Sequence, residues 1–186
     1  MIDTKKFYNL LKKKDILFFS GVPDSCMNEF CNELSNHKDI TNLVAANEGS
    51  AIGIATGYHL ATNQIPLVYM QNSGLGNTIN PLLSLCAKEV YSIPMLIIMG
   101  WRGEPDNKDE PQHIVQGRIQ NKLLESIEVP FSILPKDISK SEKYITDALN
   151  NIIKNRIPHI LIIKKNTFKK FEKNKLDKRK NISFYR

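Results

Sequence analysis

The sequence predicts an α/β fold: a doubly wound, mostly parallel sheet flanked by helices. Short apolar runs alternate with longer amphipathic stretches, which is the order of βαβ units. The apolar runs are continuous, as in Met95 to Gly100, and such strands are typical of a parallel sheet covered on both faces. All nine glycines fall between Gly21 and Gly117, and several follow directly after an apolar run. Ligands bind at that carboxyl edge of an open α/β sheet.

Apolar periodicity and capping residues predict six helices. The first covers 3–13, with Asp3 as its N-cap and with Phe7 and Leu11 on one face. The third begins after an Asn47 N-cap, and the fourth has Pro81 in its first turn, where proline is tolerated. The other helices are expected over 25–36, 114–127 and about 139–154, and the fourth covers about 78–89.

Six strands are expected between these helices, each from a short apolar run. Their ranges are 16–20, 43–46, 67–71, 95–100, 131–134 and 159–163. A polar loop over 101–113 follows the fourth strand. Long polar loops at a sheet edge are usually functional or mobile.

Length and composition fit one folded unit with a basic extension. The 186 residues are 41% hydrophobic and 24% charged, which is ordinary for a globular protein. We expect a domain over 1–165 and a basic linker or tail over 166–186. Residues 164–186 hold ten Lys or Arg against two acids, whereas residues 1–163 hold sixteen against seventeen. The neutral body argues against a nucleic-acid surface, and a solvated extension is commoner than one that binds RNA.

The start of the chain and its cysteines indicate a cytoplasmic protein. The first residues, MIDTKKFYNLLKKKD, lack the apolar region of a signal peptide, and no apolar run approaches the ~20 residues of a membrane-spanning helix. Cys26, Cys31 and Cys86 have no CxxC spacing, which favours reduced thiols. HExxH, GxSxG, GxGxxG and GxxxxGK[ST] motifs are absent, so we expect no metal site from this chain and no common hydrolase or nucleotide site.

The third expected helix carries three glycines four residues apart, Gly49, Gly53 and Gly57, directly after Glu48. Each glycine inside a helix costs about 1 kcal/mol relative to alanine. We expect another backbone or a ligand to approach closely along that face and offset this cost. Glu48 is then a candidate for chemistry, beyond the ordinary stabilisation of a carboxylate by the helix dipole.

Two short loops at the same edge supply further candidates. GVPDS at 21–25 is either a strand-to-helix turn capped by Asp24 or Ser25, or a ligand-binding loop. NSGLGN at 72–77 is rich in small residues, which would let a flat ligand sit against the backbone.

The segment after the fourth strand carries basic side chains. Arg102, Lys108 and Arg118 could bind an anion, and His113 could move a proton near neutral pH. Any one of these residues alone would more often be solvated surface.

Taken together, four segments resemble the pyrimidine-binding domain of thiamine diphosphate-dependent decarboxylases. The segments are GVPDS at 21–25, ANEGSAIGIATGYHLAT at 46–62, QNSGLGNTINPLLSL at 71–85 and IPMLIIMGWRGEPDNKDEPQHIVQGR at 93–118. They occur in the order and spacing of the family, and the resemblance covers about residues 1–170. It is strongest toward phosphonopyruvate decarboxylases, and the alpha subunits of sulfopyruvate decarboxylases are next.

The resemblance implies roles for named residues. Glu48 matches the glutamate that hydrogen-bonds the aminopyrimidine ring of thiamine diphosphate, and Asp24 and His113 match catalytic positions of the family. The positions that match cofactor-binding residues are Glu48, Pro23, Ser73, Gly74 and Asn77. The positions expected to bind the substrate are Ser25, Arg102, Lys108 and Arg118.

The resemblance also implies that half of the active site is not part of this sequence. The family binds Mg²⁺ and the diphosphate through a second domain, with a GDG motif and a later Asn, and no such motif occurs here. We therefore expect a beta subunit or a further domain to supply that half, with active sites between protomers of a homo- or hetero-oligomer. The expected reaction is decarboxylation of an anionic 2-keto acid, first phosphonopyruvate and alternatively sulfopyruvate. A non-catalytic assembly module of the same fold is a further alternative.

Overall fold

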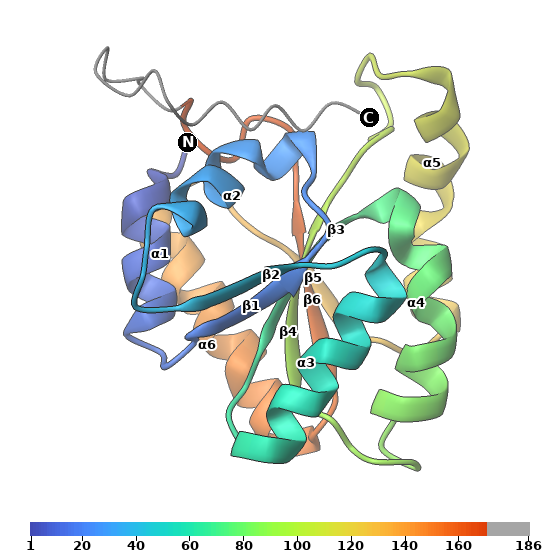
Figure 1. Cartoon of the computed structure of the whole chain (residues 1–186). Helices are drawn as coiled ribbons and strands as arrows, with labels where there is room; N and C mark the ends of the chain where they lie inside the picture. Colours follow the sequence, from blue (N-terminus) through green and yellow to red (C-terminus); the bar gives the residue numbers. More distant parts are fainter. Residues whose placement is uncertain (171–186) are drawn as a thin grey trace.

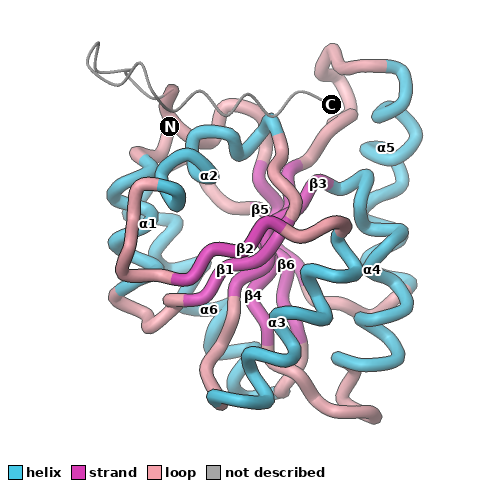
Figure 2. Tube along the Cα trace, in the orientation of Figure 1, coloured by secondary structure: helices cyan, strands magenta, loops and turns pink. Residues whose placement is uncertain are grey.

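The computed structural model describes residues 1–170, and these residues build a six-stranded sheet with helices on both faces (Figure 1, Figure 2). All neighbouring strands are parallel, in the order β2-β1-β3-β4-β6-β5. The strands are β1 Phe18–Gly21, β2 Thr41–Val44, β3 Leu67–Gln71, β4 Met95–Gly100, β5 Phe131–Ile133 and β6 Pro158–Ile163. The chain runs outward from β1 to β2 and then returns to β3 on the other side of β1. The strand order therefore reverses between β1 and β3, and ligands bind at such switch points.

The six α-helices divide between the two faces of the sheet (Figure 1). One face is covered by α1 Thr4–Lys12, α2 Asn28–Ser35 and α6 Ile138–Asn155, and the other by α3 Glu48–Thr62, α4 Leu75–Pro81 and α5 Pro111–Ser126. Each face has its own apolar core. Phe7, Phe30 and Ile145 belong to the first core, and Ile52 and Leu124 belong to the second. The predicted α/β class is confirmed.

Helix α4 differs from the sequence prediction. Helical structure begins as a 3-10 turn over Asn72–Gly74, continues through α4 and widens into a π-helical segment over Leu82–Cys86. Pro81 is the last residue of α4 and not part of its first turn, so that prediction is wrong. A proline has no N–H for the carbonyl four residues earlier, here that of Asn77, and the regular hydrogen-bond ladder is interrupted there.

Two other elements begin earlier than predicted. Helix α5 begins at Pro111 and not at 114, with the proline at the start of its first turn, where its fixed φ suits a helix. This places His113 on a helix and not in the preceding loop. Strand β2 lies at an edge of the sheet and ends at Val44, and its Leu43 and Val44 side chains are exposed.

The three helical glycines do not share one environment. A Cβ on Gly49 would lie 2.7 Å from the carbonyl oxygen of Asn77, the carbonyl to which Pro81 cannot donate. Helices α3 and α4 can therefore approach closely at this point. Gly53 and Gly57, in contrast, have open space within residues 1–170 where a Cβ would be. Among residues 1–170, the expected close approach occurs at Gly49 alone of the three.

Past position 165 the described chain still packs on the domain. Phe168 pairs with Ile2 in a parallel bridge, is 4% exposed, and stacks on Phe30. The rest of the predicted linker or tail, residues 171–186, lies outside the described residues. Within residues 1–170, no helix is both long and apolar enough to cross a membrane.

The two glycine environments predict opposite effects of alanine on stability. Gly53→Ala should stabilise the chain on its own by up to about 1 kcal/mol, because it improves helix propensity and meets no neighbour. Gly49→Ala should destabilise it, since the new methyl would press on the α4 backbone. Urea denaturation of both variants checks this. A destabilised Gly53→Ala variant would contradict the open environment of that residue.

Candidate active site

The predicted site residues gather at the carboxyl ends of β1, β3 and β4, beside the point where the strand order reverses. Asp24 follows β1, the 3-10 turn Asn72–Gly74 follows β3, and Arg102 follows β4. Glu48 reaches the same edge as the first residue of α3. The loop between β4 and α5 extends beyond this edge (Figure 1).

The carboxylate of Glu48 is nearly buried, and neighbouring residues pack closely around it. It is 9% exposed, and its Oε2 accepts a hydrogen bond of 2.8 Å from the side-chain amide of Asn77. A Cβ on Gly74 would overlap its carboxyl group, so glycine at that position leaves the room that the carboxyl occupies. The Asn47 side chain caps α3, and the positive end of the helix dipole favours a negative charge at Glu48. The structure thus brings together Glu48, Gly74 and Asn77.

Asp24 is 4% exposed, and both of its carboxylate oxygens accept hydrogen bonds. Its Oδ1 accepts from the Gln71 side-chain amide at 2.9 Å, and its Oδ2 accepts from the Cys26 N–H at 3.1 Å. Gly100 leaves room for the carboxylate, because a Cβ there would overlap Oδ2. Burial raises the pKa of Asp24, and the hydrogen bonds from Gln71 and Cys26 and the charge of Arg102 partly oppose that shift. A proton can therefore bind here at a higher pH than at an exposed aspartate.

Arg102 connects three loops. Its guanidinium pairs with both carboxylate oxygens of Asp109, and its Nη1 donates to the Ser25 hydroxyl at 2.8 Å. Its backbone N–H and carbonyl both bond the side chain of Asn72, at 3.0 and 2.8 Å. The Arg102 side chain lowers the pKa of Asp109, and the N–H groups of Gly103 and Glu110 act in the same direction. The charge of Arg102 is thus already largely balanced by a neighbouring carboxylate.

His113 lies in the first turn of α5, and the backbone around it is closely packed. It is 9% exposed, and its Nδ1 is buried without a hydrogen-bond partner among residues 1–170. Gly103 has a φ of +66°, and a Cβ on it would overlap the His113 carbonyl. Gly117 packs directly on the backbone of Gly103, and the Trp101 indole donates to the Gly117 carbonyl at 3.0 Å. Two glycines therefore let α5 approach the loop that follows β4.

The remaining predicted residues are more open. Pro23 and Ser73 are half-buried in the loops after β1 and β3. Lys108 and Arg118 are exposed, and no ion pair within residues 1–170 involves either of them. The structure does not bring these two side chains into the cluster around Arg102.

Three members of the cluster were not predicted from the sequence. They are Gln71, Asn72 and Asp109, which bond respectively to Asp24, to the Arg102 backbone and to the Arg102 guanidinium. The signal for Gln71 and Asn72 was their place directly at the end of an apolar run. Asp109 carries no comparable signal, because its contact with Arg102 depends on how the polar loop folds.

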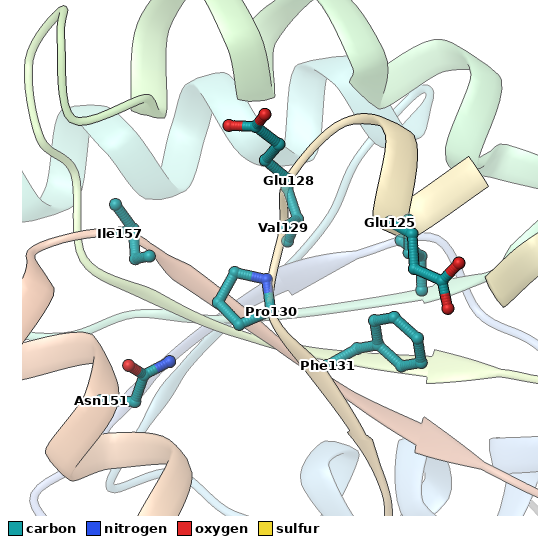
Figure 3. A pocket seen from close by; sticks show the side chains of 8 residues that line it. Glu125, Glu128, Val129, Pro130, Phe131, Asn151 and Ile157 are labelled. Carbon is teal, nitrogen blue, oxygen red and sulfur yellow. The ribbon is translucent and has the colours of Figure 1, made fainter. Parts of the chain in front are cut away.

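A hollow lies elsewhere, at the amino ends of β5 and β6 (Figure 3). Its volume is about 520 Å³. It is lined by Leu124, Glu125, Glu128, Val129, Pro130, Phe131, Asn151 and Ile157. None of these residues is a predicted site residue, and the hollow is on the edge of the sheet opposite Glu48 and Asp24.

The family model described as "Thiamine pyrophosphate enzyme, N-terminal TPP binding domain" matches residues 4–124. The chain therefore belongs to the thiamine pyrophosphate enzymes, as their N-terminal, TPP-binding domain.

Its relatives among characterised proteins are decarboxylases. The chain is 35% identical over 156 residues to sulfopyruvate decarboxylase subunit alpha of Methanococcus maripaludis, covering 84% of this chain and 90% of that protein. It is 38% identical over 116 residues to phosphonopyruvate decarboxylase of Streptomyces viridochromogenes, covering 62% of this chain and 28% of that protein. This chain thus spans less than a third of the latter relative. The predicted resemblance to thiamine diphosphate-dependent decarboxylases is confirmed.

The fold is also similar to that of solved enzymes. Benzoylformate decarboxylase from Polynucleobacter necessarius superimposes with a TM-score of 0.68, covering 97% of this chain and 33% of that one, at 18% identity. At this identity the similarity concerns the fold alone.

The Arg102–Asp109 contact predicts a pH-dependent contribution to stability. Asp109→Asn should destabilise the chain at pH 7 by about 1–3 kcal/mol, because it removes the charge that pairs with Arg102. The pKa of Asp109 is lowered in the folded state, so this contribution is fully present above its unfolded pKa of about 4, is reduced at pH 3, and is lost completely only as the pH falls through the lower pKa of the folded state. Urea denaturation at pH 7 and pH 3 measures the difference.

Asp106→Asn, in the same loop and exposed, is the matched control and should have little effect at either pH. A loss of stability in Asp109→Asn that is equally large at pH 3 would contradict the ionic origin of the contribution.

Proposed function

We propose that this chain is the pyrimidine-binding subunit, or domain, of a thiamine diphosphate-dependent 2-keto acid decarboxylase, with Glu48 at the centre of its chemistry. The observation that carries the proposal is the nearly buried carboxylate of Glu48 at the start of α3, held by Asn77 beside the space that Gly74 leaves. A flat heteroaromatic ring with a nitrogen that takes up a proton fits such a site, because the carboxylate can share that proton away from bulk water.

The residues present suit the pyrimidine part of the cofactor. Glu48 would hold a proton between its free oxygen and the ring nitrogen, while Asn77 fixes the other carboxylate oxygen. Thiamine diphosphate, when bound, supplies the electron sink that decarboxylation of a 2-keto acid requires. Asp24, whose pKa is raised by burial, would hold a proton at the carboxyl end of β1, and His113, whose Nδ1 has no partner among residues 1–170, would offer a second site for proton transfer.

The diphosphate and Mg²⁺ are proposed to bind to another domain. No group of three or more His, Cys, Asp or Glu residues in the described part of the chain could hold a metal ion. The relatives named as an alpha subunit support a separate partner subunit, which would complete the site between two chains.

The bare face of α3 supports the location of that partner. This α3 face consists of Gly53, Ile54, Gly57 and Leu60; the two glycines have open space beside them, and Leu60 is 63% exposed. Nothing within residues 1–170 offsets the roughly 1 kcal/mol that each glycine costs in a helix. A partner helix that packs closely on this face would offset it, and it would lie next to Glu48.

For the substrate we propose sulfopyruvate first and phosphonopyruvate second. The sequence alone favoured phosphonopyruvate, and that relative is slightly more identical over the shared segment. The sulfopyruvate relative, however, matches over 90% of its own length as a separate subunit. Arg102, Lys108, Arg118 and the Ser25 hydroxyl are the proposed contacts of the terminal anion. Because Asp109 already balances Arg102, the exposed Lys108 and Arg118 would supply much of the positive charge.

The decisive assay is carbon dioxide release from each keto acid with thiamine diphosphate and Mg²⁺, using this chain mixed with a candidate diphosphate-binding subunit. Glu48→Gln should lower kcat by at least about 100-fold, because the amide cannot take up a proton although it can still accept from Asn77. Its unfolding free energy should stay close to that of the wild type. Glu89→Gln, an exposed glutamate, is the control and should turn over normally.

Competition between the two keto acids in the same assay decides the substrate. Wild-type rates in Glu48→Gln would refute the assigned role of this residue. Absence of release from every mixture of folded subunits would favour the non-catalytic module.

The partner surface has its own test. Gly53→Leu should weaken association with the diphosphate-binding subunit by at least about tenfold, because the side chain occupies the space that the partner needs. Asn150→Leu, on the exposed surface of α6 across the sheet, is the control and should associate normally. Sedimentation velocity of the mixed chains measures both. Equal affinities in the two variants would contradict a contact on the α3 face.

A further inference from the structure

We propose that Gln71 is a positioning residue that orients the carboxylate of Asp24 and that Ser73 fixes the orientation of the Gln71 amide. Neither role follows from the family assignment. The observation is a short chain of hydrogen bonds in which the Ser73 hydroxyl donates to Gln71 Oε1 and Gln71 Nε2 donates to Asp24 Oδ1, the latter at 2.9 Å.

The backbone places Gln71 for this role. It is the last residue of β3 and is paired in register with Gly100, the last residue of β4. Gly100 is also the residue against which Asp24 Oδ2 lies. Three strand ends therefore converge on one carboxylate: β1 supplies it, β3 supplies the Gln71 donor, and β4 supplies the glycine that leaves room for it.

The amide can serve both protonation states of Asp24. When Asp24 is ionised, Gln71 Nε2 donates to it and Oε1 accepts from Ser73. When Asp24 is protonated, a rotated amide would accept a hydrogen bond from the carboxyl O–H at Oε1 and donate one from Nε2 to the Ser73 oxygen. This is possible because a hydroxyl both donates and accepts hydrogen bonds. The buried carboxyl group thus keeps a hydrogen-bond partner during a proton transfer, whereas an unpaired buried group would be costly.

The other ionisable groups that face Asp24 keep the same charge around neutral pH. Arg102, from the loop after β4, is the charged group that favours its ionised form. The thiols of Cys26 and Cys31 also lie near Asp24, and burial raises the pKa of each to about 12, so both remain neutral around pH 7. A change at Gln71 should therefore be detectable at Asp24 without a second group titrating in the same range.

The test is a carboxyl titration of the full chain labelled with ¹³C at its aspartates, in the absence of substrate, cofactor and partner. The Asp24 signal is identified by its loss in Asp24→Asn. In Gln71→Met, which has similar length and no donor, the titration midpoint of Asp24 should rise by about one pH unit, because the bond from Gln71 to the ionised carboxylate is stronger than the bond to the protonated one. In Gln71→Glu it should rise further, because a like charge then adjoins it. Gln64→Met, exposed and ahead of β3, is the matched control and should leave the midpoint unchanged.

An unchanged Asp24 midpoint in a folded Gln71→Met or Gln71→Glu variant would overturn the proposal. Should Gln71→Met not fold, the nearly isosteric Gln71→Glu variant provides the same decision. Ser73→Ala should produce a smaller rise than Gln71→Met, since the amide remains but loses its fixed orientation, and an unchanged midpoint in Ser73→Ala would overturn the role assigned to Ser73.

The catalytic meaning of this contact depends on the proposed function, but the contact itself does not. In the assembled enzyme, Gln71→Met should lower kcat by about tenfold or more and shift the pH profile of kcat in the same direction as the titration midpoint. An inactive wild-type mixture would count against the proposed function and leave the titration result intact. Normal kcat and an unshifted profile in an active Gln71→Met enzyme would overturn the positioning role.

Discussion

The contact between the ends of β3 and β4 is the constraint on which the site depends. The Asn72 side chain bonds both the N–H and the carbonyl of Arg102 and so continues the contact between the two strands, one residue beyond β3 and two residues beyond β4. Asn72 is 2% exposed, so both bonds are shielded from water. This pairing sets the direction in which each chain leaves the sheet. Gln71 then points to Asp24 and the Arg102 guanidinium reaches Asp109, while the next turn of chain carries Gly74 past Glu48. A shift of either strand end would alter all of these contacts together.

The fold affects the ionisation of the two aspartates of the site in opposite directions. Asp109 is stabilised as an anion by Arg102, whereas burial makes ionisation of Asp24 unfavourable a short distance away. Above the unfolded pKa of an aspartate, an ionised Asp24 therefore lowers the stability of the fold. Such costs are typical of functional positions, since a carboxyl group that holds a proton near neutral pH needs a partly desolvated environment. The apolar cores, one on each face of the sheet, offset this cost in stability.

The sequence predicted the features that depend on local pattern. Strands β3 and β4 agree with prediction at both ends, because each is a continuous apolar run that begins directly after a proline. The N-caps Asp3 and Asn47 were likewise predicted, since capping is a local interaction. The π-helical segment after Pro81 and the partners of Arg102 were not, because both depend on which backbones meet in space. The resemblance between motifs supplied the candidate site residues, while the open environment of Gly53 and Gly57 could be seen only once α3 had been placed on the sheet.

The bare glycines of α3 have a consequence for when the chemistry becomes available. Gly53 lies five residues after Glu48, about 7.5 Å along the helix axis. A helix with glycines on an uncovered face holds its first turn less firmly, and a partner that covers the face would tighten it. In the proposed function, the Glu48 carboxylate would then reach its working geometry only after the two chains have met. An unassembled subunit would then be inactive, and the residues of the proposed partner contact would also determine when Glu48 can react.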